Sequence, residues 1–373
     1  MFFRSLPLAL IVAFVLSAPL RVRAENAVKQ ATSTGSGQAA PTADPLPLKQ
    51  VRFFAYQLQG IQDAGALDAL VASSYDVLVL EPTRTDWSKD DSSRNFDTKG
   101  MLARLKASPA SDGVHRKRVM AYIDIGEAEN YRWYWSWSQN WAKHKPKPAD
   151  WPAFIVTPDP DGWSGNFPVA FWRPEWKDIV IYGKNTPVDA SRDFISVLDE
   201  VVSDGFDGIY LDWVEAYDQN AVKKVAQADG VDPAAEMIKF IGEMRAYARQ
   251  RNSDFTVIQQ NASELLDGHP GLGDVVDGIA QEDTWYSGAS DVGWESRRGY
   301  DKRQNRTQTA ETIAGLDKFI AAGKVVFTVD YTVKNAPAVY SDSRAHGYIP
   351  YCSRSSLAKL TTTPPPDLPA VGK

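Results

Sequence analysis

The 373-residue sequence predicts an α/β fold, a (β/α)8 TIM barrel in a single domain with a Trp-rich insertion loop. Two observations predict it. Eight short apolar, β-branched segments recur along the chain, and stretches with apolar residues at three- and four-residue spacing separate them. Near-continuous apolar strands are typical of a parallel sheet covered on both faces, and the repeated strand–helix order favours a closed barrel. The alternative is an open doubly wound sheet, which lacks support because no G-x-G-x-x-G turn follows an early strand.

The expected elements alternate along the body of the chain. The strands are predicted at residues 51–57, 76–80, 119–125, 206–211, 255–259, 275–280, 325–329 and 347–351. The helices are predicted at residues 65–73, 99–106, 172–182, 190–203, 233–252 and 308–322. Asp232 followed by Pro233 has the pattern of a helix N-cap with proline at the first helical position. The aromatic segment 128–171 is too long for a simple connection, and we expect it to form an insertion over the barrel mouth.

The two ends of the chain differ in composition from its body. Residues 1–24 combine a charged start, an apolar run and small residues before a cleavage point, which indicates a signal peptide. The alternative is a retained membrane anchor, but the run is shorter than the roughly 20 residues that span a bilayer. Small and polar residues predict a disordered linker at 25–48 and a flexible tail at 361–373. The catalytic barrel should therefore occupy residues 49–360.

The composition limits the cellular compartments and the kinds of partner that we expect for this protein. The signal peptide predicts an exported protein, periplasmic or secreted, with no stable membrane anchor after cleavage. We also expect the protein to be a monomer. The net charge of −6 without a Lys/Arg cluster argues against nucleic acid as a partner. Cys352 is the single cysteine, so no intrachain disulfide forms, and we interpret it as an inert buried thiol. Four scattered histidines and the absence of nucleotide-binding motifs predict no metal and no cofactor. The 12 tryptophans favour a sugar-binding groove, with helix packing as the alternative.

Polar residues at the carboxyl ends of the strands are the candidates for chemistry, because barrel enzymes place their sites there. The set is acidic and contains no basic nucleophile. Cleavage of a glycosidic bond requires such a set: one carboxyl group protonates the leaving oxygen, and a second attacks the anomeric carbon or activates water. The sequence therefore favours a metal-independent glycoside hydrolase with a polysaccharide substrate.

Asp212 and Glu282 are the candidate catalytic pair. Asp212 directly follows the apolar strand 206–211, although a loop cap or an ion-pair partner is the alternative. Glu282 and Asp283 both follow the strand at 275–280. Because side chains alternate along a strand, one of these two should point into the barrel mouth. We favour Glu282.

Ten further residues are candidate substrate-binding groups. Their carboxylates and the one amide can hydrogen-bond to sugar hydroxyl or amino groups, and their aromatic rings can form the walls of sugar-binding subsites. Internal ion pairs, helix caps and core packing are the alternatives for each of them. They are Asp124, Glu81, Glu127, Tyr56, Tyr122, Tyr210, Asn261, Trp285, Asp330 and Tyr331.

Three fragments at these strand ends together resemble glycoside hydrolase family 114. They are AYIDIGEAE at 121–129, GFDGIYLD at 205–212, and Gln281-Glu282. The resemblance extends over about residues 50–355, where Phe171-Trp172, Trp176, Gln260-Asn261 and Asp330-Tyr331 also match the family pattern.

The resemblance implies a (β/α)8 barrel with endo-α-1,4-polygalactosaminidase activity. The implied substrate is a polymer of galactosamine and N-acetylgalactosamine that is partly deacetylated and hence cationic. The resemblance places the catalytic pair at Asp212 and Glu282, and an analogy with related retaining barrels makes Asp212 the nucleophile and Glu282 the acid/base. Two other functions stay open: a catalytically silent carbohydrate-binding barrel, and a barrel hydrolase of another glycan such as an α-galactoside.

Overall fold

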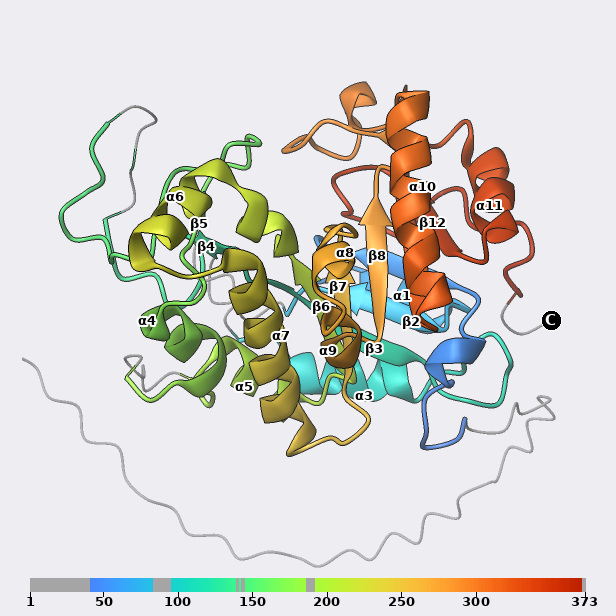
Figure 1. The fold of residues 1–373 in the computed structure, drawn as a ribbon. Helices are drawn as coiled ribbons and strands as arrows, with labels where there is room; N and C mark the ends of the chain where they lie inside the picture. The colour runs from blue at the N-terminus through green and yellow to red at the C-terminus, as the bar shows by residue number, and fades with distance from the viewer. Residues whose placement is uncertain (1–40, 83–94, 139–140, 142–144, 186–191, 371–373) are drawn as a thin grey trace, which may run out of the picture. The chain divides into compact units, whose positions relative to one another are not determined.

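A computed structural model describes residues 41–82, 95–138, 141, 145–185 and 192–370 (Figure 1). The predicted signal peptide and residues 25–40 of the predicted linker lie outside these residues. Eight parallel strands form one sheet in the order β1-β2-β3-β6-β7-β8-β11-β12. They are β1 (Phe54–Gln57), β2 (Val77–Leu80), β3 (Arg118–Asp124), β6 (Gly208–Asp212), β7 (Thr256–Gln260), β8 (Gly278–Glu282), β11 (Val325–Tyr331) and β12 (Ile349–Ser353).

The first and last strands of the sheet approach each other and close the barrel. The rings of Phe54 on β1 and Tyr351 on β12 lie 5.7 Å apart between centroids. Just beyond the two strands, the backbone N–H of Leu58 donates to the carbonyl of Leu357 at 2.9 Å. The predicted (β/α)8 barrel is therefore confirmed, and all eight predicted strands are found within a few residues of their expected bounds.

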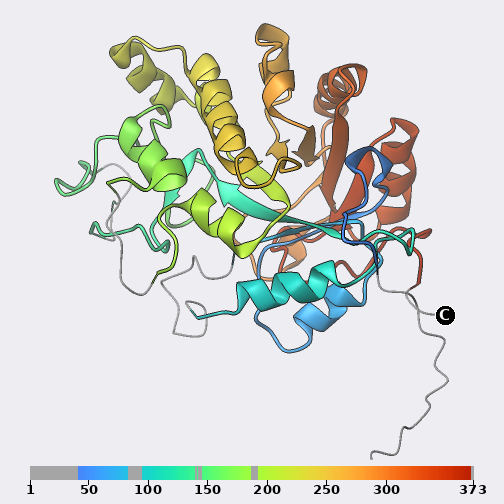
Figure 2. The same cartoon turned by 90° about the horizontal axis from the view of Figure 1, so that it is seen from below.

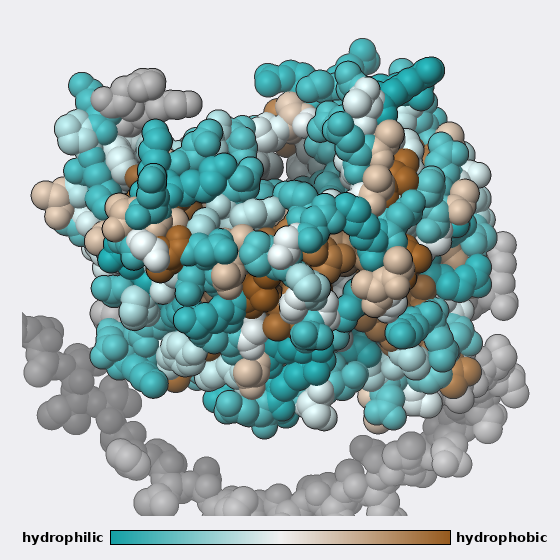
Figure 3. Space-filling view, in the orientation of Figure 1, coloured by the Kyte–Doolittle hydropathy of each residue, from teal (hydrophilic) through white to brown (hydrophobic). Residues whose placement is uncertain are grey.

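Helices cover the outer side of the sheet (Figure 1, Figure 2). The α-helices are α1 (Ala66–Val71), α3 (Thr98–Lys106), α4 (Pro174–Lys177), α5 (Val197–Asp204), α6 (Asn220–Asp229), α7 (Pro233–Arg249), α8 (Leu265–Gly268), α9 (Leu272–Val275), α10 (Arg306–Ala321) and α11 (Ala336–Ala345). A π-helical turn, Asp178–Tyr182, continues α4. The exterior seen in Figure 3 is mostly hydrophilic, with small hydrophobic patches between the helices.

Each predicted helix has a counterpart, with differences that have local causes. The Asp232 side chain accepts hydrogen bonds from the first turn of α7, as its position before Pro233 predicts. The helix expected at 190–203 begins only at Val197, because Ser196 caps it by accepting from the N–H of Asp199 at 3.0 Å. The sequence pattern missed α6, α8, α9 and α11. Of these, α8 and α9 are single turns, and α6 buries only Val222 and Ala226.

Aspartates at the amino ends of three strands tie each strand to its neighbour. Asp76, Asp207 and Asp277 accept backbone N–H groups of Phe53, Val119 and Val257, respectively, at 2.9 to 3.0 Å. Two of them are also paired with cations: Arg116 contacts Asp207 and Arg245 contacts Asp277, both at 2.8 Å. At this rim Asp207 and Asp277 are therefore neutralised by a cation, whereas the buried Asp76 is held by backbone N–H groups.

The insertion begins and ends in a small antiparallel hairpin of β4 (Glu127–Glu129) and β5 (Asn166–Pro168). Between them the aromatic residues pack on one another, with ring centroids 4.7 to 5.7 Å apart. They are Trp135, Trp137, Trp141, Trp151, Phe154 and Phe167. Most tryptophans of the insertion thus form its own core, so their number alone was a poor indicator of a sugar groove.

The packed body extends beyond residues 49–360 at both ends. Leu46 is buried, and its N–H donates to the carbonyl of Arg116 at 3.2 Å. Near the other end, the Tyr340 hydroxyl donates to the carbonyl of Thr363 at 2.8 Å, and Arg344 pairs with Asp367 at 2.6 Å. Within the described ranges, no helix has both the length and the apolar character that a membrane crossing needs.

Candidate active site

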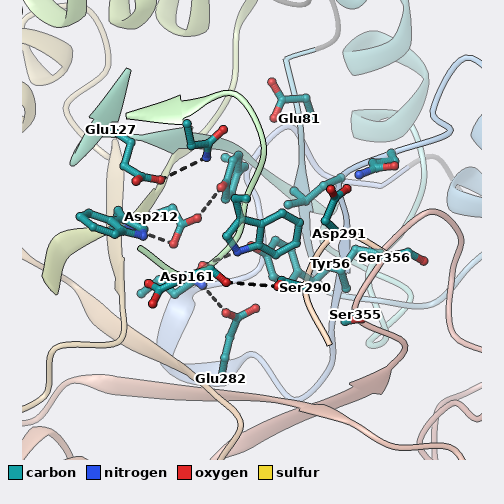
Figure 4. A pocket seen from close by; sticks show the side chains of 18 of the residues that line it. Tyr56, Glu81, Glu127, Asp161, Asp212, Glu282, Ser290, Asp291, Ser355 and Ser356 are labelled. Carbon is teal, nitrogen blue, oxygen red and sulfur yellow. Dashed lines mark hydrogen bonds between the residues drawn. The ribbon is translucent and has the colours of Figure 1, made fainter. Parts of the chain in front are cut away.

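A cavity of about 580 Å³ opens at the carboxyl ends of the strands (Figure 4). Its described lining contains nine carboxylates and not one Lys, Arg or His side chain. The carboxylates come from the strand ends, from the insertion and from the loop after β8. They are Glu81, Glu127, Glu129, Asp161, Asp212, Glu215, Glu282, Asp283 and Asp291.

Asp212 is the last residue of β6 and lines this cavity. Its Oδ2 accepts a hydrogen bond from the Tyr122 hydroxyl, and its Oδ1 accepts from the N–H of Trp213 at 2.8 Å. Burial raises the pKa of Asp212, while these two donors lower it because they stabilise the ionised form. Asp212 therefore has the environment of a carboxylate that can carry charge inside the protein.

Glu282 is the last residue of β8 and lines the same cavity. Its Oε1 accepts from the Tyr331 hydroxyl and its Oε2 accepts from Gln260 Nε2 at 2.6 Å. Burial raises the pKa of Glu282 well above its usual value, and the nearby carboxylates Asp212 and Asp283 raise it further. The proton thus belongs preferentially on Glu282. Two carboxyl groups with different protonation states are the arrangement that acid–base cleavage of a glycoside needs.

Three consecutive strands of the barrel end in residues with left-handed backbone conformation. Trp213, Asn261 and Asp283 follow β6, β7 and β8, and each has φ of 56°. This region is common for Asn and Asp but unfavourable for Trp, and such strain gathers at functional sites. At β7 the turn lets Asn261 Oδ1 accept the N–H of Glu282 at 3.0 Å, which fixes the backbone of the candidate acid.

Glu215 is a third carboxylate beside the pair, and sequence reasoning missed it. It lies on a short 3-10 helix, Val214–Asp218, after β6, and its Oε1 accepts from Asn261 Nδ2 at 3.1 Å. Its Oε2 is buried without a hydrogen-bond partner. Burial, and then the charge of Asp212, raise the pKa of Glu215 to about 7. Glu215 follows Asp212 by three residues, before any helical pattern begins. This position is the sequence feature from which it could have been predicted.

Eight of the twelve predicted site residues line the cavity: Asp212, Glu282, Glu81, Glu127, Tyr56, Tyr122, Asn261 and Tyr331. Four do not: Asp124, Tyr210, Trp285 and Asp330. Asp124 Oδ1 accepts the N–H groups of Gly126 and Glu127, at 3.0 and 2.9 Å. Asp330 Oδ1 accepts those of Trp285 and Tyr286, at 2.6 and 2.8 Å. These two aspartates hold the loops that carry the site, and they do not face the cavity.

Tyrosines form the floor of the cavity from within the barrel. The Tyr56 hydroxyl donates to Gln260 Oε1 at 3.2 Å, so it orients the amide that donates to Glu282. Tyr210 lies below it, with ring centroids 5.0 Å apart, and is buried in the core. Tyr210 therefore does not line the cavity, in contrast to its prediction as a substrate-binding residue, and it supports the floor from the core.

One wall of the cavity contains a buried ion-pair group. Arg132 contacts Glu81 and also Glu129, whose Oε2 lies 2.5 Å from its Nε. Tyr131 donates its hydroxyl to the other oxygen of Glu129. Both carboxylates line the cavity while their charge is balanced from behind, in contrast to Asp212 and Glu282, for which no cation lies within ion-pair distance among the described residues.

Other residues that line the cavity were not among the predicted site residues, because which side chains reach the cavity depends on the whole fold. They are Glu129, Tyr131, Asp161, Trp163, Asn166, Trp213, Gln260 and Asp291. Trp163 is 39% exposed, which makes it the member of the Trp-rich insertion that a sugar ring can reach.

The chain belongs to glycoside-hydrolase family GH114, whose profile matches residues 37–366. The resemblance recognised at the strand ends is thereby confirmed. An uncharacterized protein of Deinococcus radiodurans is 30% identical over 347 residues, which cover 90% of this chain and 94% of that protein. An uncharacterized protein of Methanocaldococcus jannaschii is 31% identical over 326 residues, covering 83% of this chain and 78% of that protein.

Two solved structures share the fold. The glycoside hydrolase domain of PelA from Pseudomonas aeruginosa superimposes with a TM-score of 0.52 at 16% identity, over 84% of this chain and 98% of that one. Aspergillus fumigatus Ega3, solved in complex with galactosamine, superimposes with a TM-score of 0.52 at 14% identity, over 88% of this chain and 98% of that one.

The raised pKa of Glu215 makes a prediction about stability. Because its folded-state pKa is about 7 and its usual value 4.5, the folded protein binds more protons between these values. The contribution of Glu215 to the free energy of unfolding is therefore fully present below pH 4.5 and is lost as the pH rises through 7. The free energy of unfolding of the wild type should therefore fall between pH 5 and pH 8. In Glu215→Gln it should fall by about 1 to 3 kcal/mol less.

Urea denaturation at the two pH values measures this difference. Glu175→Gln, at an exposed glutamate on α4, controls for the loss of one negative charge. An equal pH dependence in the wild type and in Glu215→Gln would contradict the prediction.

Proposed function

We propose that the protein hydrolyses α-1,4-linked polymers of galactosamine and N-acetylgalactosamine as an endo-acting polygalactosaminidase. The observation that carries this proposal is the pair of half-buried carboxyl groups, Asp212 and Glu282, each held by its own tyrosine in one cavity. Membership of glycoside-hydrolase family GH114 supports hydrolysis. The galactosamine complex of the structurally similar Ega3 supports an amino sugar as substrate.

The charge of the cavity supports a cationic substrate. Nine carboxylates line it, and no basic side chain is present in its described lining. A partly deacetylated polymer carries ammonium groups, and opposite charges attract more strongly in a partly buried site than in water. Glu81 and Glu129 are paired with Arg132, whereas the other seven acids have no cation within ion-pair distance among the described residues, and a neutral glycan would supply none.

In the proposed mechanism Glu282 acts first as the general acid. Its raised pKa keeps its proton at neutral pH, and it delivers this proton to the glycosidic oxygen as the bond breaks. Asp212, whose charge is supported by Tyr122 and by the N–H of Trp213, attacks the anomeric carbon. Glu282, now ionised, then takes a proton from the water that releases the sugar from Asp212.

Substitution of the pair tests the assignment. Asp212→Asn and Glu282→Gln should each lower kcat by roughly 10² to 10⁴-fold, the usual contribution of a catalytic acid or base. Asp283→Asn is the matched control, because this residue also lines the cavity and follows Glu282 directly. It should lower kcat by less than about tenfold, because Asp283 takes no part in the proton transfer and acts on it only by raising the pKa of Glu282.

Release of reducing ends from partly deacetylated α-1,4-galactosamine polymer by the mature chain is the measurement. Activity retained in both Asp212→Asn and Glu282→Gln would contradict the proposal. So would a loss in Asp283→Asn as large as that in Glu282→Gln. Binding of the polymer by the wild type without any reducing ends would favour the silent binding barrel instead.

We also propose that residues 1–24 direct export and are removed. A bacterial host that expresses the whole chain should then release from its cytoplasm a product that starts at Glu25. Mass spectrometry of the exported protein measures this start. Retention of an intact product beginning with Met1 in the cytoplasm would contradict it.

A further inference from the structure

Glu127 is a fully buried carboxyl group that nevertheless lines the cavity. Its Oε2 accepts a hydrogen bond from Asn166 Nδ2 at 3.1 Å, and its Oε1 has no hydrogen-bond partner in the structure. Figure 4 shows this carboxyl group beside Asp212 at the pocket. A buried polar atom without a partner costs free energy, so one that borders a cavity indicates a partner that arrives from that cavity.

The surroundings of Glu127 favour its neutral form when the cavity is empty. Burial raises its pKa to about 10, with a further increase from Asp159, and the amide of Asn166 opposes the shift. The charged groups that act on it from the adjoining elements are all acidic: Asp124, Glu129, Asp159 and Asp212. Arg132, the cation of this wall, is paired with Glu81 and Glu129.

The local structure holds Glu127 in place before any ligand binds. Its N–H donates to Asp124 Oδ1 at 2.9 Å, and β5 lies across from it in the hairpin. Gly126 allows the close approach to the next strand end, since a Cβ there would lie 2.2 Å from the carbonyl oxygen of Trp213. The carboxyl group is thus prepositioned, which reduces the cost of ordering it on binding.

We propose that Glu127 recognises the free amino group of the sugar. The incoming ammonium pairs with Oε1, and the carboxyl group gives up its proton to solvent, so that a buried neutral acid becomes one half of an ion pair. No covalent bond to carbon changes, and one proton is released for each ammonium bound. This inference rests on the proposed amino-sugar substrate.

The pairing gives a rule for selectivity at this subsite. An N-acetyl group or a hydroxyl group has no positive charge, so it cannot compensate an ionised Glu127. Such groups meet only a neutral acid and gain an ordinary hydrogen bond, which is weaker than one to a charged partner. Glu127 therefore selects a deacetylated residue over an acetylated one.

Calorimetry of the mature wild-type chain at pH 7 tests this in two buffers of different ionisation enthalpy. Galactosamine should release close to one proton per molecule bound, whereas galactose and N-acetylgalactosamine should release none. Glu127→Gln keeps the shape of the side chain but has no proton to lose. It should bind galactosamine at least tenfold more weakly without proton release, with its affinity for galactose changed less than twofold.

Asp291→Asn is the matched control, because Asp291 also lines the cavity but is exposed to solvent. Its proton release with galactosamine should match that of the wild type. Three results would overturn the inference: no binding of galactosamine or no proton release in the wild type, release that persists in Glu127→Gln, or release that disappears in Asp291→Asn. The wild-type result needs no variant to fold.

Hydrolysis of the polymer separates this inference from the proposed function. If the wild-type chain produces reducing ends but releases no proton with galactosamine, the proposed function stands and the proposed role of Glu127 is wrong. If the chain releases the proton but does not cleave the polymer, the amine subsite stands and the proposed activity is wrong.

Discussion

The burial of carboxyl groups without cations at one rim of the barrel is the constraint on which the site depends. At the opposite rim, Asp207 and Asp277 are equally placed at strand ends but are paired with arginines at 2.8 Å. At the cavity, Asp212 and Glu282 receive neutral donors only, from tyrosines, an amide and a backbone N–H. A neutral donor supports a carboxylate without cancelling its charge. The same side-chain chemistry thus stabilises the fold at one rim and remains reactive at the other.

The features that could be predicted from the sequence are those set by local periodicity and by barrel geometry. Apolar strands followed by single acids placed Asp212 and Glu282 on one rim, because the carboxyl ends of parallel strands in a barrel all point the same way. The orientation of individual side chains was less predictable. Asp124 and Asp330 follow the same pattern, yet their oxygens cap loop N–H groups. The difference depends on loop conformation, which periodicity does not specify.

The contributions of the insertion could not be predicted for the same reason. Its tryptophans suited a sugar groove, but Trp135 and Trp151 pack edge to face, with centroids 4.9 Å apart. Their core supports a hairpin that carries Glu127 and Asn166 to the cavity. The polar residues of the insertion therefore matter more for substrate than most of its aromatic ones, with Trp163 as the exposed exception.

The central claim is that Asp212 acts ionised and Glu282 protonated, with a tyrosine lowering the pKa of each, and the pH dependence of kcat/KM tests it most directly. The acidic limb should report ionisation of Asp212 and the alkaline limb the loss of the Glu282 proton. Each hydroxyl lowers the pKa of its partner. Tyr122→Phe should therefore move the acidic limb to higher pH, and Tyr331→Phe should move the alkaline limb to higher pH. Profiles that keep both limbs in place, or that move the opposite limb in each variant, would contradict the account.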